Sequence, residues 1–204
     1  MSELAFYIRI VKALEEIEAP YMIVGAFAAT SFGLYRATYD IDILVDLRDE
    51  DFDALAEKFP LPRYYADPQM MRNWTRMGLM FNIIDTNEGA KADLVPMTRE
   101  PGYQVAFNRC IRRTFEDEQG NTFEAWCAQP TDIIIGKLKA WTEGRSNKHP
   151  DDIRAVLYFI FSGLSEEPVN LPEIEQEAAR LSPETLQLWQ ALVARAERDA
   201  RQEE

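Results

Sequence analysis

The feature that most constrains the fold of this chain is a pair of aspartates, Asp40 and Asp42, which follow Gly25 by fifteen and seventeen positions. Alternate side chains of a β-strand point to the same face of a sheet. A strand through this pair therefore directs both carboxylates to one face and Ile41 and Ile43 to the other. We predict the order strand, small-residue turn, helix and second strand within about thirty residues.

A buried strand is predicted just before the turn. Tyr21–Val24 is a short apolar run entered through Pro20 and closed by Gly25, which is typical of such a strand. Gly25 and Ala26 are small, so a ligand can approach the backbone closely, and the helix formers that follow turn free N–H groups toward an anion. The turn is therefore a candidate site for a triphosphate.

The paired carboxylates favour a bound cation. Placing like charges close together costs free energy unless a cation neutralises them, and hard oxygen ligands suit Mg²⁺ held between a protein and substrate phosphates. The alternative interpretation of Asp40 and Asp42 is a solvated strand end, which is common for an isolated Asp-x-Asp. The order and spacing of the whole segment favour nucleotide chemistry.

This segment resembles the nucleotidyltransferase superfamily with the DNA polymerase β fold, whose pattern is apolar-Gly-(Gly/Ser), a spacer, then Asp-apolar-(Asp/Glu)-apolar. Val24, Gly25 and Ala26 match the first part, and Asp40–Ile43 matches the second. Ala26 departs from the family's Gly or Ser: it keeps the small size but has no hydroxyl to donate to a phosphate. The resemblance implies that phosphate contact at this turn rests on backbone amides.

The resemblance also implies a third carboxylate on a neighbouring strand, and Asp93 is the candidate. It lies in Lys91–Val95, which follows the mostly apolar stretch 79–84 and a turn-rich segment. A hairpin beside the Asp40 strand is therefore predicted. Asp85 is the competing residue, although its position at a strand-to-turn junction suits turn chemistry better. The alternative for Asp93 is an exposed acid at a strand start.

The block 129–141, followed by 144–154, is similar to the AbiEii-like branch of the superfamily, which includes toxins of type IV toxin-antitoxin systems. That branch has a lysine on one helix and an aspartate opening the next. The resemblance, which spans about residues 20–160, implies that Lys137 contacts nucleotide phosphates and that an aspartate supports the lysine or the site. The alternative is that the Lys137 stem packs along the core and the aspartate is a helix N-terminal charge.

Helical geometry chooses between the two candidate aspartates. The buried stripe of the second helix places Asp152 at its flank and Asp151 nearly opposite. Asp152 is therefore the predicted partner residue. The stripe consists of Ile153, Val156, Leu157, Ile160 and Phe161.

The predicted fold class is α+β: a nucleotidyltransferase fold with a mixed, mainly antiparallel sheet flanked by helices, and a helical C-terminal region. We expect a catalytic domain over 1–130 and a helical region over 131–204 packed against it. Thr131 is the expected N-cap of that region's first helix, and segment 70–74 is expected in the core or a lid. Helices are expected at 4–17, after Gly25, at 49–59, from 131 onward and over 171–201 with a break at Pro183; strands are expected at 21–24, from 40, and at 79–84, 91–95, 110–115 and 122–128.

Few other residues carry a chemical signal. His149 is the only histidine, which excludes a histidine metal cluster, and it is expected in an extended loop before Pro150. Cys110 and Cys127 are too far apart for a Cys-x-x-Cys motif, and reduced thiols suit a cytoplasmic protein. No apolar run approaches the length needed to cross a membrane, so no membrane partner is expected.

The net charge of −13 disfavours a nucleic-acid partner, because an acidic surface repels phosphate backbones. The charge is uneven, however, and basic residues slightly outnumber acids between 99 and 148. These basic residues could form a positively charged rim that binds an RNA acceptor. The alternative, of equal weight, is that they only balance the charge of neighbouring acids. The basic residues are Arg99, Arg109, Arg112, Arg113, Lys137, Lys139, Arg145 and Lys148.

Together these features predict a cytoplasmic, Mg²⁺-dependent nucleotidyltransferase. Asp40, Asp42 and Asp93 are expected to hold two metal ions, and the enzyme is expected to move a nucleoside monophosphate from an NTP to a hydroxyl of RNA or tRNA, a protein or a small molecule. A type IV toxin with a cognate antitoxin is one form of this prediction. The alternatives are an antibiotic or small-molecule adenylyltransferase and a noncatalytic nucleotide-binding partner protein.

Overall fold

The computed structural model describes residues 3–34, 40–116 and 122–202. The chain divides into two compact units. The sheet unit comprises Met1–Phe27 and Ala37–Ala128, and the helical unit comprises Ala28–Arg36 and Gln129–Glu204. A short helix, α2 (Gly25–Thr30), begins in the first unit and ends in the second.

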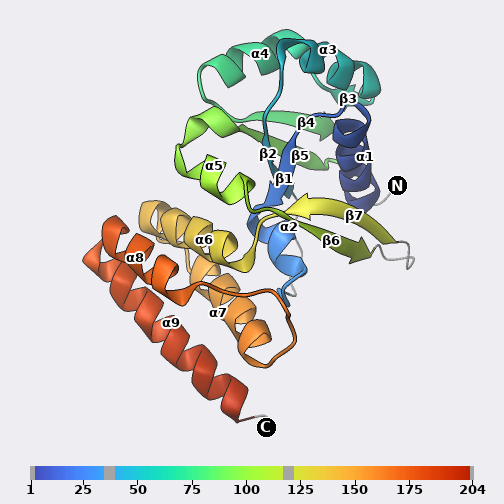
Figure 1. The fold of residues 1–204 in the computed structure, drawn as a ribbon. Helices are drawn as coiled ribbons and strands as arrows, with labels where there is room; N and C mark the ends of the chain where they lie inside the picture. The colour runs from blue at the N-terminus through green and yellow to red at the C-terminus, as the bar shows by residue number, and fades with distance from the viewer. Residues whose placement is uncertain (1–2, 35–39, 117–121, 203–204) are drawn as a thin grey trace. The chain divides into compact units, whose positions relative to one another are not determined.

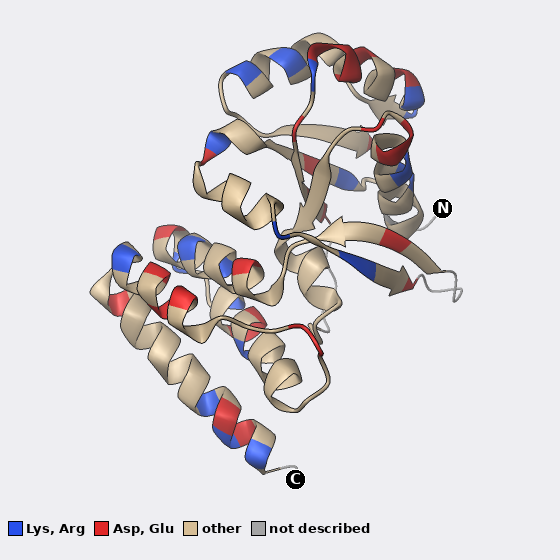
Figure 2. Cartoon of the chain, viewed as in Figure 1, with Lys and Arg blue, Asp and Glu red and all other residues tan. Residues whose placement is uncertain are grey.

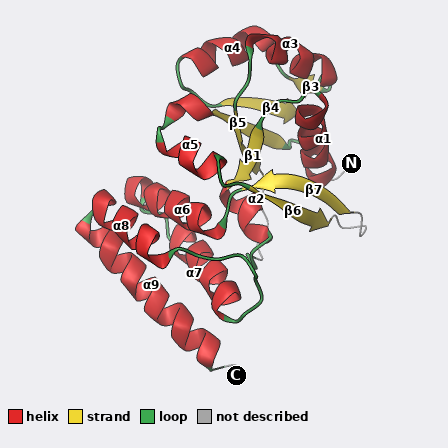
Figure 3. Cartoon of the chain, in the orientation of Figure 1, coloured by secondary structure: helices red, strands yellow, loops and turns green. Residues whose placement is uncertain are grey.

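All seven described strands form one sheet in the order β3-β4-β5-β2-β1-β7-β6 (Figures 1 and 3). Four of the six described pairings are antiparallel, and the pairs β1–β7 and β2–β5 are parallel. The predicted mixed, mainly antiparallel sheet is thereby confirmed. The strands are β1 (Tyr21–Val24), β2 (Asp40–Val45), β3 (Tyr64–Tyr65), β4 (Phe81–Asp85), β5 (Lys91–Pro96), β6 (Ile111–Glu116) and β7 (Thr122–Cys127).

The centre of the sheet is held by β1, β2 and β5. Ile41 and Ile43 of β2 are fully buried, whereas Asp40 and Asp42 on alternate positions are partly exposed. This alternation over Asp40–Ile43 is the one predicted from the strand period. It ends at Leu44, which shares the face of the two acids and is 2% exposed. The acids of β2 are thus accessible at the beginning of the strand.

Aromatic side chains pack helices of the sheet unit against one another and against the sheet. Phe6 packs edge-to-face on Phe59 and stacks on Tyr64, with ring centroids 6.3 and 6.1 Å apart. All three side chains are at most 3% exposed. These contacts join the first helix, the end of the third helix and β3. The helices are α1 (Glu3–Glu16), α3 (Asp49–Lys58), α4 (Pro68–Arg76), the 3₁₀ turn η1 (Met97–Arg99) and α5 (Gly102–Phe107).

Segment 70–74, expected in the core or a lid, lies within α4. The helix begins at Pro68 after Asp67, whose carboxylate accepts hydrogen bonds from the backbone N–H groups of Gln69 and Met70. This is an N-cap followed by proline at the first helical position, which favours helix initiation. α4 packs on α3 and contacts β4 (Figure 1), so its Met71 is fully buried while Trp74 is 40% exposed.

The helical unit contains α6 (Pro130–Gly144), α7 (Lys148–Phe161), α8 (Leu171–Leu181) and α9 (Pro183–Arg201) (Figure 1). Pro183 separates α8 from α9 as predicted, and Ser182 caps α9 by accepting a hydrogen bond from the Thr185 N–H. Acidic and basic residues alternate along the C-terminal half of α9 (Figure 2).

Two local predictions in the helical unit are wrong. Thr131 is not the N-cap of α6, because Pro130 already occupies the first helical position and Gln129 is the capping residue. The buried Thr131 hydroxyl instead accepts a hydrogen bond from the Asn170 backbone N–H at 2.9 Å. His149 lies inside α7, not in an extended loop, because Pro150 falls within the first turn of that helix, where a proline is tolerated.

Candidate active site

The three predicted metal-ligating acids lie on one face of the sheet. Asp42 of β2 is directly opposite Asp93 of β5 in the parallel pairing, and Asp40 is directly opposite Lys91. Directly opposed residues of paired strands point to the same side, as do residues two apart on one strand. Asp40, Asp42 and Asp93 therefore share what we call the acidic face.

Two side chains next to Asp93 also belong to this face, and sequence reasoning missed both. Lys91 Nζ donates a hydrogen bond to Asp93 Oδ2 at 2.8 Å, and Asn82 Nδ2 donates one to Oδ1. Asn82 is the residue of β4 directly opposite Asp93. The available signal was the strand period, since Lys91 precedes Asp93 by two positions and must share its face.

Lys91 is surrounded by negative charge. The hydrogen bond to Asp93 raises the pKa of the Lys91 ammonium, partial burial opposes this, and the charges of Asp93, Asp40 and Asp42 raise the pKa further, so that it lies above its ordinary value. Lys91 is therefore a protonated cation at neutral pH. Its side chain is 38% exposed, whereas that of Asp93 is 7% exposed.

Gly25 stands at the junction of β1 and α2 and leaves space for Asp42. Its φ of 69° lies in the left-handed region that favours glycine. A Cβ atom at this position would lie 3.0 Å from Asp42 Cγ and would overlap Oδ2. The small-residue turn predicted from the sequence is thus in direct contact with one of the acids.

Asp85, the competing third carboxylate, has a different role. It is fully buried at the end of β4, where Arg63 Nη2 donates to its Oδ2 at 2.7 Å and the Asn87 N–H donates to its Oδ1 at 3.0 Å. Burial raises the pKa of Asp85, but these hydrogen bonds outweigh burial and hold it below its ordinary value. Asp85 therefore fixes the β4–β5 turn, as its position in the sequence indicated.

The helical unit contains the two remaining predicted site residues as a buried ion pair. Lys137 Nζ of α6 donates to Asp152 Oδ2 of α7 at 2.6 Å. Their side chains are 6% and 2% exposed. Asp151 is exposed, and Asp152, the aspartate that the helix period favoured, is the one that contacts Lys137. The pair joins α6 to α7, and its predicted part in nucleotide binding stays a prediction.

The acidic face suits a divalent cation by donor type, since it offers carboxylate oxygens from adjacent strands. Among residues 3–34, 40–116 and 122–202, however, no three acidic, histidine or cysteine side chains are gathered closely enough to hold one ion as they stand. Lys91 lies on this face, where its ammonium donates to Asp93 Oδ2 while Asn82 donates to Oδ1. Both oxygens of Asp93 therefore already have a hydrogen-bond partner.

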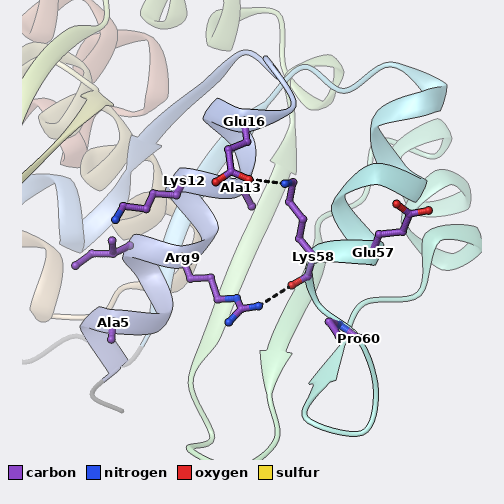
Figure 4. Close-up of a pocket in the computed structure, with 9 residues that line it drawn as sticks. Ala5, Arg9, Lys12, Ala13, Glu16, Glu57, Lys58 and Pro60 are labelled. Atoms are coloured by element: carbon purple, nitrogen blue, oxygen red, sulfur yellow. Dashed lines mark hydrogen bonds and ion pairs between the residues drawn. The ribbon is translucent and has the colours of Figure 1, made fainter.

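The sheet unit also has a cavity of about 590 Å³ formed by α1 and α3 (Figure 4). Two of its three basic residues have partners: Arg9 donates to the Lys58 carbonyl oxygen at 3.1 Å, and the Lys58 ammonium pairs with Glu16. None of the acids of the acidic face lines this cavity. We therefore locate the candidate active site on the sheet face and not in this cavity.

The fold is that of the nucleotidyltransferases. The chain aligns with the crystal structure of ANT(2'')-Ia in complex with adenylyl-2''-tobramycin at 16% identity, covering 89% of this chain and 97% of that one, with a TM-score of 0.52. The solution structure of the antibiotic-resistance factor ANT(2'')-Ia aligns at 16% identity over 98% and 94% of the two chains, with a TM-score of 0.45. An antigenic nucleotidyltransferase-like protein from Paracoccidioides brasiliensis aligns at 16% identity over 91% and 90%, with a TM-score of 0.48.

No family model and no curated protein matches the sequence. The assignment of the fold therefore rests on the structural alignment with a TM-score above one half. Among the helices in the described part of the chain, none combines the length and the apolar character that a membrane crossing requires.

Proposed function

We propose that the acidic face catalyses metal-dependent transfer of a nucleoside monophosphate from an NTP to an acceptor hydroxyl. The observation that carries the proposal is the register of β2 and β5, which puts Asp42 opposite Asp93 with Asp40 on the same face. Three carboxylates from two adjacent strands are the donor set that the motif requires. The nucleotidyltransferase fold of the chain supports this reading of the site.

In the proposed reaction, the acceptor oxygen bonds to the α-phosphorus while the bond from that phosphorus to the bridging oxygen of the β-phosphate breaks, and pyrophosphate leaves. Asp93 takes the proton of the acceptor hydroxyl. When bound, a divalent cation such as Mg²⁺ would supply positive charge that stabilises the attacking and leaving oxygens. Asp40, Asp42 and Asp93 would hold the cation, Asp40 and Asp42 would orient the triphosphate, and the backbone at Gly25 and Ala26 would contact a phosphate.

The roles of Lys137 and Asp152 form a separate part of the proposal. In the AbiEii-like interpretation, Lys137 binds nucleotide phosphate and Asp152 keeps the lysine charged and oriented. The 2.6 Å ion pair supports the second half of this interpretation, because the Asp152 carboxylate fixes the position of the Lys137 ammonium. An alternative is that the pair serves only to join α6 and α7.

Two classes of acceptor are candidates: a small molecule and RNA. A net charge of −13 disfavours a polyanionic acceptor, and the similar structure of ANT(2'')-Ia holds an adenylylated small molecule. Both observations favour a small-molecule acceptor. Basic residues lie on several elements of both units (Figure 2), so an RNA acceptor, with a toxin role and a cognate antitoxin, is the second candidate.

The test is incubation of the protein with each labelled NTP and Mg²⁺ in three parallel reactions containing total RNA, a protein extract, or a panel of hydroxyl-bearing small molecules that includes aminoglycosides. Label in one acceptor fraction identifies nucleotide and acceptor together. Growth arrest on expression, together with labelled RNA, supports the toxin candidate. Nucleotide binding without transfer in any reaction supports instead the noncatalytic alternative, in which Ala26 marks a site that lacks the family's hydroxyl.

A further inference from the structure

The acidic face contains its own cation. Lys91 lies opposite Asp40 in the β2–β5 register, and its ammonium donates to Asp93 Oδ2 at 2.8 Å. Asp42 completes the set of acids, being opposite Asp93 on the neighbouring strand. One positive charge is thus placed among the three carboxylates to which the sequence motif assigns metal binding.

Several cations of the sheet unit are ion-paired, and two of them have two acidic partners: Arg72 pairs with Asp49 and Asp53, and Arg48 with Glu50 and Asp51. Arg63 pairs with Asp85 at a turn, and Lys58 pairs with Glu16 between two helices, each with a single acid as its main partner. Lys91 instead carries the electrostatic influence of three acids, Asp93, Asp40 and Asp42. What distinguishes Lys91 is that these three acids are the ones to which the sequence motif assigns metal binding.

Lys91 is also able to leave Asp93. Its side chain is 38% exposed while that of Asp93 is 7% exposed, and a lysine has a long, flexible stem that can move its charge into solvent. Asp93 also accepts a hydrogen bond from Asn82 on its other oxygen, a bond in which the lysine takes no part. Opening the contact therefore exposes a carboxylate that is already oriented by its neighbour.

We propose that Lys91 is a resident counter-cation that competes with the divalent metal for Asp93 and thereby sets the metal affinity of the acidic face. The inference rests on the proposed function in one respect, namely that the acidic face binds a divalent cation. In the metal-free protein Lys91 compensates the repulsion among the acids. When the ion binds, the contact between Lys91 and Asp93 opens. The metal then stabilises the folded protein in place of that contact.

The experiment measures Mn²⁺ binding by electron paramagnetic resonance in the absence of nucleotide. The variants are Lys91→Gln, which keeps a hydrogen-bond donor without the charge, and Lys91→Arg, which keeps the charge. Lys58→Met is the matched control, because Lys58 is a similarly exposed ion-paired lysine at 31%. We expect Lys91→Gln to bind Mn²⁺ about tenfold more tightly than wild type, since a charge next to a carboxylate changes its cation affinity by about that factor or more. Lys91→Arg and Lys58→Met should stay within about twofold of wild type.

Thermal unfolding gives a second readout. Metal-free Lys91→Gln should unfold at a lower temperature than wild type, adding Asp93→Asn to it should recover part of the loss, and saturating Mn²⁺ should raise its Tm by more than it raises that of wild type. The inference is overturned if Lys91→Gln binds Mn²⁺ no more tightly than wild type while Asp42→Asn abolishes binding; the metal site itself then stands. Mn²⁺ binding that is insensitive to Asp42 in every variant overturns the proposed function as well.

Discussion

Gly25 and Asp42 are so close that any side chain at position 25 would occupy the space of the Asp42 carboxylate, with a Cβ atom 3.0 Å from Asp42 Cγ and nearer still to Oδ2. The contact joins the two halves of the sequence motif, the turn and the Asp-x-Asp strand. Position 25 therefore needs glycine for two separate reasons: its backbone lies in the left-handed region, and there is no room for a side chain.

Replacing Gly25 by alanine is expected to lower nucleotidyl transfer by about 100-fold, because the Asp42 carboxylate must move by roughly an ångström to make room. Gly89→Ala is the matched control. Gly89 has a similar φ of 72° but nothing within 4 Å of a Cβ, so it carries the backbone strain without the overlap. Steady-state transfer assays and thermal unfolding of both variants separate the two effects. Equal loss of activity in the two variants would refute the steric role of Gly25.

Asp42→Asn is expected to reduce transfer by about 100-fold or more, because it removes a charged oxygen ligand while keeping the size of the side chain. Asp46→Asn changes an exposed aspartate just beyond the same strand and should leave transfer unchanged. The measurement is incorporation of labelled nucleotide, with circular dichroism to verify folding. Transfer by a folded Asp42→Asn variant at the wild-type rate would place the metal elsewhere.

The Lys137–Asp152 pair provides a test that separates stability from nucleotide binding. Lys137→Met should destabilise the fold by about 3–5 kcal/mol, because it leaves the buried Asp152 carboxylate without its cation, and Lys137→Met with Asp152→Leu should recover most of that loss. Urea unfolding measures stability and equilibrium dialysis measures NTP affinity. A double variant that is stable but binds NTP weakly supports the phosphate role, whereas unchanged affinity assigns the pair to structure alone.

The stability of the sheet unit is expected to fall in acid partly through Asp85. Its folded-state pKa is lowered, so its contribution is present above the unfolded-state pKa of about 3.9 and is lost as pH falls through the folded-state value. The Asp85→Asn variant should therefore be less stable than wild type at pH 7 and show a shallower decline below about pH 4. Unfolding free energies from urea titrations at several pH values test this.

Arg63→Gln is the companion variant for the acid-stability test. Without the arginine, the pKa of Asp85 should rise from its lowered value, because the hydrogen bond and charge of Arg63 are lost while burial and the backbone hydrogen bonds from Asn87 and Glu88 remain. The stability that Asp85 contributes above about pH 4, and its loss in acid, should therefore both be smaller than in wild type. An identical pH profile for wild type, Arg63→Gln and Asp85→Asn would show that this pair does not contribute to acid sensitivity.

Elements whose pattern is long or sharply bounded were predictable from the sequence. The strand Tyr21–Val24 was predicted correctly because proline and glycine delimit an apolar run. The break at Pro183 was predicted correctly because proline cannot continue a preceding helix. The two-residue β3 and the short α5 were missed, since so few residues display no period. Thr131 was misassigned because the cap preference of threonine was weighed above the position of Pro130.

The candidate site was predictable in part. The strand period places Asp40 and Asp42 on one face, and the hairpin brings Asp93 beside them. The positions of Lys91 and Asn82 were not predicted, because a lysine at a strand start is usually solvated and an asparagine in an apolar strand has no spacing signal of its own. Which side chains neutralise the acids depends on cross-strand register, which is a tertiary property.

The parallel register between β2 and β5 also makes the acidic face a long-range product of folding. Asp42 and Asp93 are fifty-one positions apart along the chain and become neighbours only when β5 docks, so no fragment ending before β5 can assemble the three acids. The segment between α3 and β4 contains β3 and α4, and added residues should be tolerated in its loops, because the cost of loop closure grows only slowly with length. A slip of β5 by a single residue, in contrast, would turn Asp93 into the core and replace it on the face by an alanine or a leucine.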